Sequence, residues 1–103
     1  MKVQVNTGDN VQGSEELIHL VQERIENAVA NFGDTITRVE VHLADENAAK
    51  GGADKRCLIE ARLKGLKPIA VTHQAQTLQF AVDGAAEKLK TAVGSTLGRL
   101  GTR

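Results

Sequence analysis

The sequence has 103 residues, of which 41% are hydrophobic and 25% are charged, with a formal net charge of zero and a single cysteine. This composition is typical of a folded globular domain and excludes a disordered or disulfide-stapled chain, and no stretch approaches the roughly 18 consecutive apolar residues of a membrane span. Because the N-terminal residues also lack the apolar segment of a signal peptide, we expect one domain over residues 1–103, located in the cytoplasm.

The N-terminal third of the chain predicts a strand followed by a helix. Val3 and Val5 alternate with polar residues in "KVQVN", which indicates a short strand. Ser14 and the two glutamates after it are typical of a helix start, because a hydroxyl caps free N–H groups and carboxylates favour the positive end of the helix dipole. An apolar stripe at three-and-four spacing extends this helix to a glycine cap at Gly33; its members are Leu17, Val21, Ile25, Ala28, Val29 and Phe32.

Three alternating runs and a long periodic segment complete the chain. The runs "TITRVEVHLAD", "KRCLIEARLKG" and "PIAVTHQA" predict strands, and the apolar positions from about Ala75 to about Leu100 predict a helix. The order is β-α-β-β-β-α, which favours an α+β fold with a four-stranded mixed sheet and both helices on one face. The first two strands should pair in parallel across a right-handed crossover, and the later ones should form antiparallel hairpins.

The stretch "DENAAKGGADKRCLIEARLKG" admits three interpretations: a phosphate-binding glycine loop, a metal site or a positively charged hairpin. A phosphate loop needs glycines between a strand and a helix, whereas Gly51 and Gly52 join two strands. A metal site would have to recruit Cys57, His19, His42 or His73. The strand phase places Cys57 on the core side and His42 on the open side, and no Cys-x-x-Cys or His-x-x-x-His spacing occurs. We therefore expect no metal and no cofactor.

Catalytic arrangements are equally absent from the sequence pattern. Ser14 and Ser95 lie in helical segments without a nucleophile-elbow motif. Glu40 and Glu60 could be neighbours on the open sheet face, where cross-strand ion pairs with arginines explain them better than acid–base chemistry. The sequence predicts neither an enzyme nor a small-molecule substrate.

Positive charge is concentrated in one segment of this neutral chain. The net charges of residues 1–49, 50–67 and 68–103 are −6, +4 and +2, and a local field can differ in this way from the average. The basic residues of the central segment, on and beside the hairpin, are Lys50, Lys55, Arg56, Arg62, Lys64 and Lys67. They indicate either a surface for a polyanionic partner or simply a soluble face, because lysine and arginine do not by themselves distinguish the two.

The whole chain resembles the hibernation-promoting factor and ribosome-associated inhibitor family, also called the sigma-54 modulation protein family. The resemblance rests on the element order and on the segments "VQVNTGDNV", "VANFGD" and "LQFAVDGAAEKL", and the central hairpin resembles that of one proteobacterial branch. It implies a non-enzymatic bacterial factor that binds the small ribosomal subunit and its rRNA, occupies the channel for messenger and transfer RNA, and inhibits translation during stress. Without the C-terminal dimerising domain of long members, the chain resembles a short form.

Residue by residue, the resemblance implies rRNA-phosphate contacts by cations of the helices. Those that match are Arg24 on the first helix and Lys88 on the last, with Lys90 and Arg99 as additions on the same polar side. Where family members often have further basic residues, this chain has Asn27, Thr91, Ser95 and Leu97. The expected contact set therefore combines the helix cations with those of the central segment. The alternative is a protein-interaction module of the same fold that has lost rRNA affinity.

Overall fold

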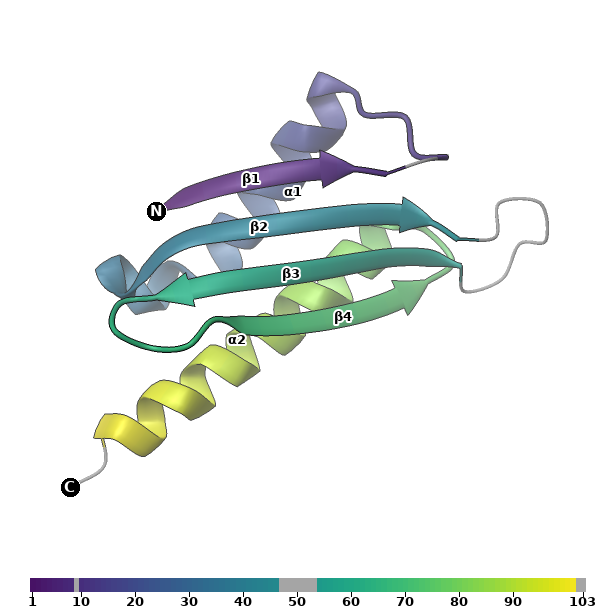
Figure 1. The fold of residues 1–103 in the computed structure, drawn as a ribbon. Helices are drawn as coiled ribbons and strands as arrows, with labels where there is room; N and C mark the ends of the chain where they lie inside the picture. Colours follow the sequence, from purple (N-terminus) through teal and green to yellow (C-terminus); the bar gives the residue numbers. More distant parts are fainter. Residues whose placement is uncertain (9, 47–53, 102–103) are drawn as a thin grey trace.

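The computed structural model describes residues 1–8, 10–46 and 54–101, and its elements follow the predicted order. They are β1 (Lys2–Thr7), α1 (Glu15–Ala28), the 3-10 helix η1 (Ala30–Thr35), β2 (Ile36–Asp45), β3 (Lys55–Leu63), β4 (Ile69–Ala75) and α2 (Leu78–Gly101). The strands form one sheet in the order β1-β2-β3-β4, with both α-helices on the same face (Figure 1). The predicted α+β architecture is confirmed.

The ends of the two helices differ in part from the sequence prediction. The hydroxyl of Ser14 accepts a hydrogen bond from the N–H of Leu17 at 3.1 Å, so the predicted N-cap of α1 is confirmed. The α-helix ends at Ala28 instead of continuing to Gly33, and the next residues form η1. Gly33 has a positive φ of 56°, which glycine adopts without strain, but its ψ of −132° is not that of a left-handed helix cap, and it lies within the 3-10 segment. α2 begins at Leu78 because Ala75 still belongs to β4.

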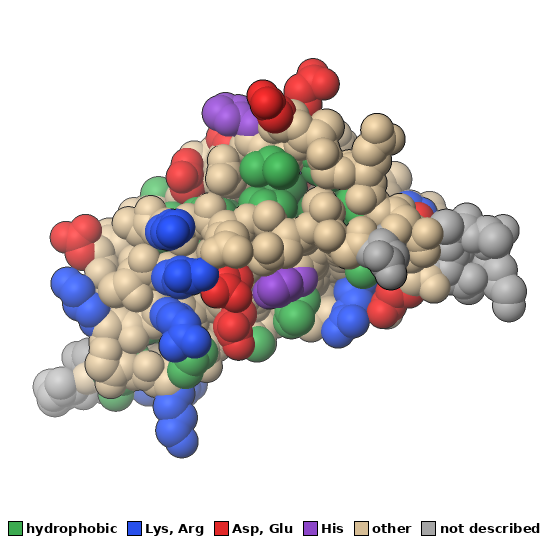
Figure 2. All heavy atoms as spheres, turned by 45° about the horizontal axis from the view of Figure 1, so that its top comes forward, with side chains coloured by type: hydrophobic (Ala, Val, Ile, Leu, Met, Phe, Trp, Pro, Cys, Tyr) green, Lys and Arg blue, Asp and Glu red, His purple; other side chains and the backbone are tan. Residues whose placement is uncertain are grey.

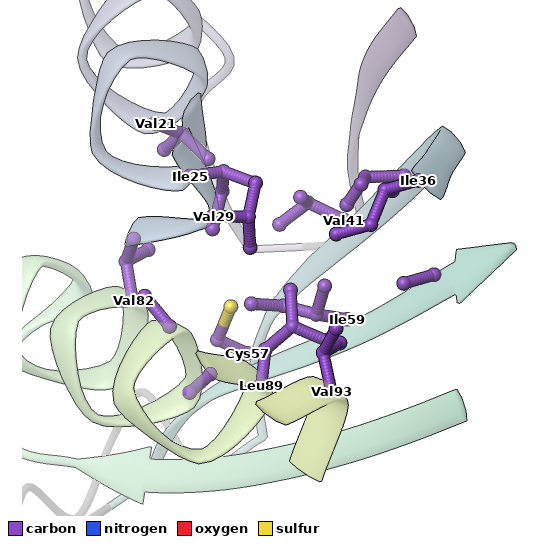
Figure 3. Close-up of a cluster of buried hydrophobic side chains, with 14 of the residues drawn as sticks. Val21, Ile25, Val29, Ile36, Val41, Cys57, Ile59, Val82, Leu89 and Val93 are labelled. Carbon is purple, nitrogen blue, oxygen red and sulfur yellow. The ribbon is translucent and has the colours of Figure 1, made fainter. Parts of the chain in front are cut away.

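The strand pairing divides the side chains of the sheet between a core face and an open face. β1 pairs with β2 in parallel and the other neighbours are antiparallel, as predicted, so that Val3, Val39 and Ala61 lie in one row. The helices cover this face, and the side chains of α1 and α2 meet those of β2 and β3 in the core (Figure 3). The core consists of Val21, Ile25, Val29, Ile36, Val39, Val41, Leu43, Cys57, Ile59, Ala61, Leu63, Ala81, Val82, Ala85, Ala86, Leu89 and Val93.

Cys57 lies in this core with none of its surface exposed, which confirms the side of the sheet predicted for it. Burial raises the pKa of the Cys57 thiol to about 12, because the apolar surroundings disfavour the thiolate. Since the thiolate is the reactive species, we expect Cys57 in the native protein to react with Ellman's reagent only as fast as the protein unfolds. Immediate labelling in guanidinium chloride is the control. Native labelling at the denatured rate would contradict the buried position.

Candidate functional site

The ten basic residues predicted as contacts fall into two groups according to what their side chains touch. Lys50 lies outside the described residues. Acidic or backbone partners hold four of the others: Arg24, Lys55, Arg56 and Lys88. The remaining five are Arg62, Lys64, Lys67, Lys90 and Arg99. In the part of the chain that the structure describes, none of these five forms an ion pair, and Arg99 donates only to the hydroxyl of Ser95, at 3.2 Å.

Arg24 forms an ion pair between the helices. Its Nη1 donates to Oδ1 of Asp83 on α2, and the two side chains are 37% and 48% exposed. An exposed pair of this kind contributes at most about 1 kcal/mol to stability, so its main consequence is electrostatic. A phosphate that approached Arg24 would also meet the Asp83 carboxylate, which lowers the attraction of this site for an anion.

The base of the β2–β3 hairpin is acidic overall among the described residues, although its sequence segment is basic. The ammonium of Lys55 lies 3.0 Å from Asp54 and 3.3 Å from Asp45, and Arg56 lies 3.2 Å from Glu46. The hydrogen bond that the Lys55 ammonium donates to Asp54 is the main cause of the raised pKa of Lys55. Two cations here face three carboxylates, so that the local net charge is −1. The positive charge that the sequence places near Lys55 and Arg56 is therefore compensated in the fold.

Lys88 and Lys90 lie on different sides of α2. The ammonium of Lys88 donates to the carbonyl oxygen of Thr72 on the edge strand β4, at 2.9 Å. Lysines often cover edge strands in this way, which discourages pairing with another chain. Two residues along an α-helix correspond to about 200° of rotation, so Lys90 points away from β4. Arg99, eleven positions after Lys88, returns to the Lys88 side. The helix cations therefore do not share one polar side, contrary to the expectation from the sequence.

Three of the five cations without acidic partners lie at the other end of the sheet. Arg62 is close to the end of β3, and Lys64 and Lys67 lie in the turn from β3 to β4; all three are exposed. The start of β1 and the C-terminal end of α2 lie at this same end (Figure 1). It is opposite to the hairpin base, where Asp45 pairs with Lys55. The basic segment of the sequence is thus divided in the fold between the two ends of the sheet. Carboxylates neutralise its cations at the hairpin base, whereas Arg62, Lys64 and Lys67 at the opposite end form no ion pair with a described residue.

Two further cations, Lys2 and Arg38, complete this basic end, and neither was predicted as a contact residue from the sequence. In the register of the sheet, Lys2 lies opposite Arg38, and Arg38 lies opposite Arg62. The next row places Glu40 opposite Glu60. The predicted cross-strand ion pairs are therefore wrong, because like charges face each other. The ion pair that does form is within β2, between Arg38 and Glu40 at 2.9 Å. Only the pairing register, which a sequence pattern does not specify, reveals this row.

Three observations on the described residues concern metal ligands, grooves and membrane spans. No group of three or more metal-ligating side chains occurs among them, and Cys57 and His42 lie on opposite faces of the sheet, as predicted. An open groove of about 600 Å³ follows one side of α2, lined by Gly84, Glu87, Lys88, Thr91, Ala92 and Ser95. No helix among the described residues is long and apolar enough to cross a membrane.

The fold and surface define a small α+β domain whose open sheet face is charged. Residues 4–100 match the model of the family described as Sigma 54 modulation protein / S30EA ribosomal protein, so the chain belongs to this family of ribosome-associated factors. The resemblance inferred from the sequence is thereby confirmed.

Two solved structures are similar in fold. A ribosomal subunit interface protein from Coxiella burnetii has 19% identity and a TM-score of 0.79, with 95% of this chain and 99% of that chain covered. The N-terminal domain of Protein Y from Thermus thermophilus has 22% identity and a TM-score of 0.73, with 90% and 96% covered. No curated protein sequence matches this chain.

Proposed function

We propose that this protein binds the small ribosomal subunit through phosphates of its rRNA, and that it occupies the channel used by messenger and transfer RNA. The observation that carries the proposal is the family match over residues 4–100. Bound there, the protein would inhibit translation and preserve idle bacterial ribosomes under stress, which is a cytoplasmic function. The exposed cations without acidic partners support this proposal, because phosphate contacts need uncompensated positive charge.

The mechanism is occlusion. Contacts between cations and phosphates fix the position and orientation of a protein on a nucleic acid without reading its sequence. Folded RNA is often recognised by shape and phosphate contacts in this way. No covalent step and no cofactor are required, since the bound domain itself fills the space that the translation substrates need. The candidates for these contacts are the ten residues of the sequence prediction, and those already held by acidic or backbone groups are the weaker ones. The held candidates are Arg24, Lys55, Arg56 and Lys88. The others are Lys50, Arg62, Lys64, Lys67, Lys90 and Arg99.

Sedimentation of the purified protein with ribosomes tests this proposal. At low salt we expect the protein to travel with small subunits and with whole ribosomes in a sucrose gradient, because a phosphate-driven complex is tightest there. It should also compete with messenger RNA for the small subunit. Absence of the protein from every ribosomal fraction at low salt would overturn the proposal.

The second candidate is a regulatory module of the same fold that binds another protein. Two observations favour it: the pairing of Arg24 with Asp83, and the exposed acidic side chains of α1, which are Glu15, Glu16, Glu23 and Glu26. Affinity purification with and without RNase distinguishes the two candidates. A single protein partner that RNase does not release would favour the module, whereas release of ribosomal components by RNase would favour rRNA binding.

A further inference from the structure

Five basic residues at one end of the open sheet face form a continuous array, which we call the basic row. Its members are Lys2, Arg38, Arg62, Lys64 and Lys67, from β1, β2, β3 and the turn after β3. Figure 2 shows lysine and arginine side chains in a line at this end of the sheet, with acidic side chains beside them. Neighbouring strands lie about 4.8 Å apart, so the three strand residues span roughly 10 Å across the sheet.

The row is not explained by the stability of the sheet. Like charges directly opposite each other on neighbouring strands are destabilising, and the row contains two such pairs in succession, Lys2 with Arg38 and Arg38 with Arg62. Arg38 is partly compensated by Glu40 at 2.9 Å and by the side-chain oxygen of Gln4 at 2.7 Å. Its Nε is nevertheless buried without a hydrogen-bond partner among the described residues. The repulsion within the row therefore destabilises the unbound protein, and a bound anion would relieve it.

We propose that the basic row is the surface through which this protein contacts the RNA backbone, with Lys2 and Arg38 as contact residues in addition to Arg62, Lys64 and Lys67. This inference rests on the function proposed above and specifies its contact surface. It differs from the contact set implied by the family resemblance, which relies on cations of the helices. The helix cation Arg24 faces a carboxylate, and Lys88 is directed at β4, whereas the row has five cations and a single ion pair.

The neighbouring acids indicate the direction of the bound backbone. Glu40 and Glu60 lie two residues from Arg38 and Arg62 along β2 and β3, in the adjacent row of the same face. A polyanion that followed the strands would meet both carboxylates. One that crossed the strands, from Lys2 towards Lys67, would meet cations alone. The RNA backbone therefore crosses the sheet at its end, approximately perpendicular to the strands.

The chemistry of this surface favours RNA over an acidic protein. Protein interfaces depend on a few buried anchors, most often tryptophan, tyrosine and arginine within an apolar patch. This chain has no tryptophan and no tyrosine. Around the row, the open face presents Gln4, Glu40 and Glu60. An array of separate cations without an apolar centre suits a partner with regularly spaced phosphates, where each contact is electrostatic.

The test compares variants that remove equal charge from different surfaces. The row variant is Arg62→Gln with Lys64→Gln and Lys67→Gln, and the matched control is Arg24→Gln with Arg56→Gln and Lys88→Gln. Affinity is measured for purified small subunits and for their protein-free RNA over a range of salt concentrations. Each phosphate contact contributes about 0.7 to the salt slope on a single strand. We expect the row variant to lower the slope by about 2 and the affinity at least about tenfold, and the control to change both much less.

A second pair of variants tests the two newly assigned residues. Lys2→Gln with Arg38→Gln should lower the slope by about 1, and Lys2→Arg with Arg38→Lys, which keeps both charges, should retain it. A thermal melt of each variant separates loss of contact from loss of folding, since Arg38 also bonds to Gln4 and Glu40.

The outcomes distinguish the contact surface from the function. If small subunits bind but the control variant loses as much affinity as the row variant, the row is overturned and the function stands. If protein-free RNA binds through the row but intact small subunits do not bind, the proposed function is overturned. The row would then still be an RNA-binding surface. Absence of both kinds of binding overturns both proposals. A fourth outcome is a protein partner that RNase does not release from the wild-type protein and that the row variant fails to bind. That outcome would show that the row binds protein instead of RNA.

Discussion

A rise in salt from about 50 to about 200 mM should weaken the complex with the small subunit by about 100-fold. Each phosphate contact releases counterions, and at about 0.7 per contact the five residues of the basic row correspond to a slope of roughly −3.5 in a double-logarithmic plot. A fourfold change in salt then gives a change in affinity of about two orders of magnitude. Filter binding or fluorescence anisotropy with labelled protein measures it directly.

The slope also separates the two candidate functions. The row variant provides the internal control, because it should follow a line about 2 units shallower than the wild-type protein. A slope near zero for the wild-type protein would mean that apolar contacts and neutral hydrogen bonds dominate the complex. That result would contradict a phosphate-driven mechanism and would favour the protein-interaction module.

Substitution of Gly84 by alanine should destabilise the fold by about 1–2 kcal/mol, although alanine favours helix formation. A Cβ at Gly84 would lie 2.1 Å from Cδ2 and 2.3 Å from Nε2 of His73, so either the imidazole ring or α2 must move. Inserted atoms typically cost about 1–3 kcal/mol, and contacts as short as these belong to the upper part of that range, about 2–3 kcal/mol. The gain in helix propensity offsets about 1 kcal/mol of this cost. For a domain of this size, the melting temperature should fall by roughly 10 °C.

Two comparisons isolate the cause of this effect. Gly98→Ala on the same helix should be neutral or stabilising by up to about 1 kcal/mol, since a Cβ there meets no atom of another described element within 4 Å. In a His73→Ala background, Gly84→Ala should no longer destabilise, because the ring that it would strike is gone. Persistence of the full loss in that background would show that the close approach of α2 to β4 is not the reason for the glycine.

The two ends of the sheet differ in how far their positive charge is compensated. At the hairpin base, Asp45, Glu46 and Asp54 compensate Lys55 and Arg56. At the opposite end, the turn that carries Lys64 and Lys67 has no acidic residue between Arg62 and Ile69. Electrostatic attraction therefore acts at one end of the molecule, which would orient it on a polyanion before close contacts form.

Local patterns were sufficient to predict most of the fold. Alternation placed Cys57 on the core side and His42 on the open side, and the Ser14 cap marked the start of α1, because period and capping are properties of a few neighbouring residues. The end of α1 was predicted too late. The stripe continues through Val29 and Phe32, and both residues do pack against the core, but from the end of the helix and from η1. Apolar residues at helical spacing do not distinguish an α-helix that continues from one that is followed by a tighter 3-10 turn.

The candidate site was harder to predict from the sequence, because charges that interact in the fold can be far apart along the chain. The sequence by itself determined the element order, the inward and outward faces of each strand and membership of the family, since these follow from periodicity and from the order of short motifs. Only the tertiary structure decided which cations have acidic partners. Arg24 and Asp83 are 59 positions apart, and Lys2 and Arg38 meet through the register of a parallel pair. Register and helix packing result from burial of the whole core, so no segment read alone contains the arrangement of charge that they create.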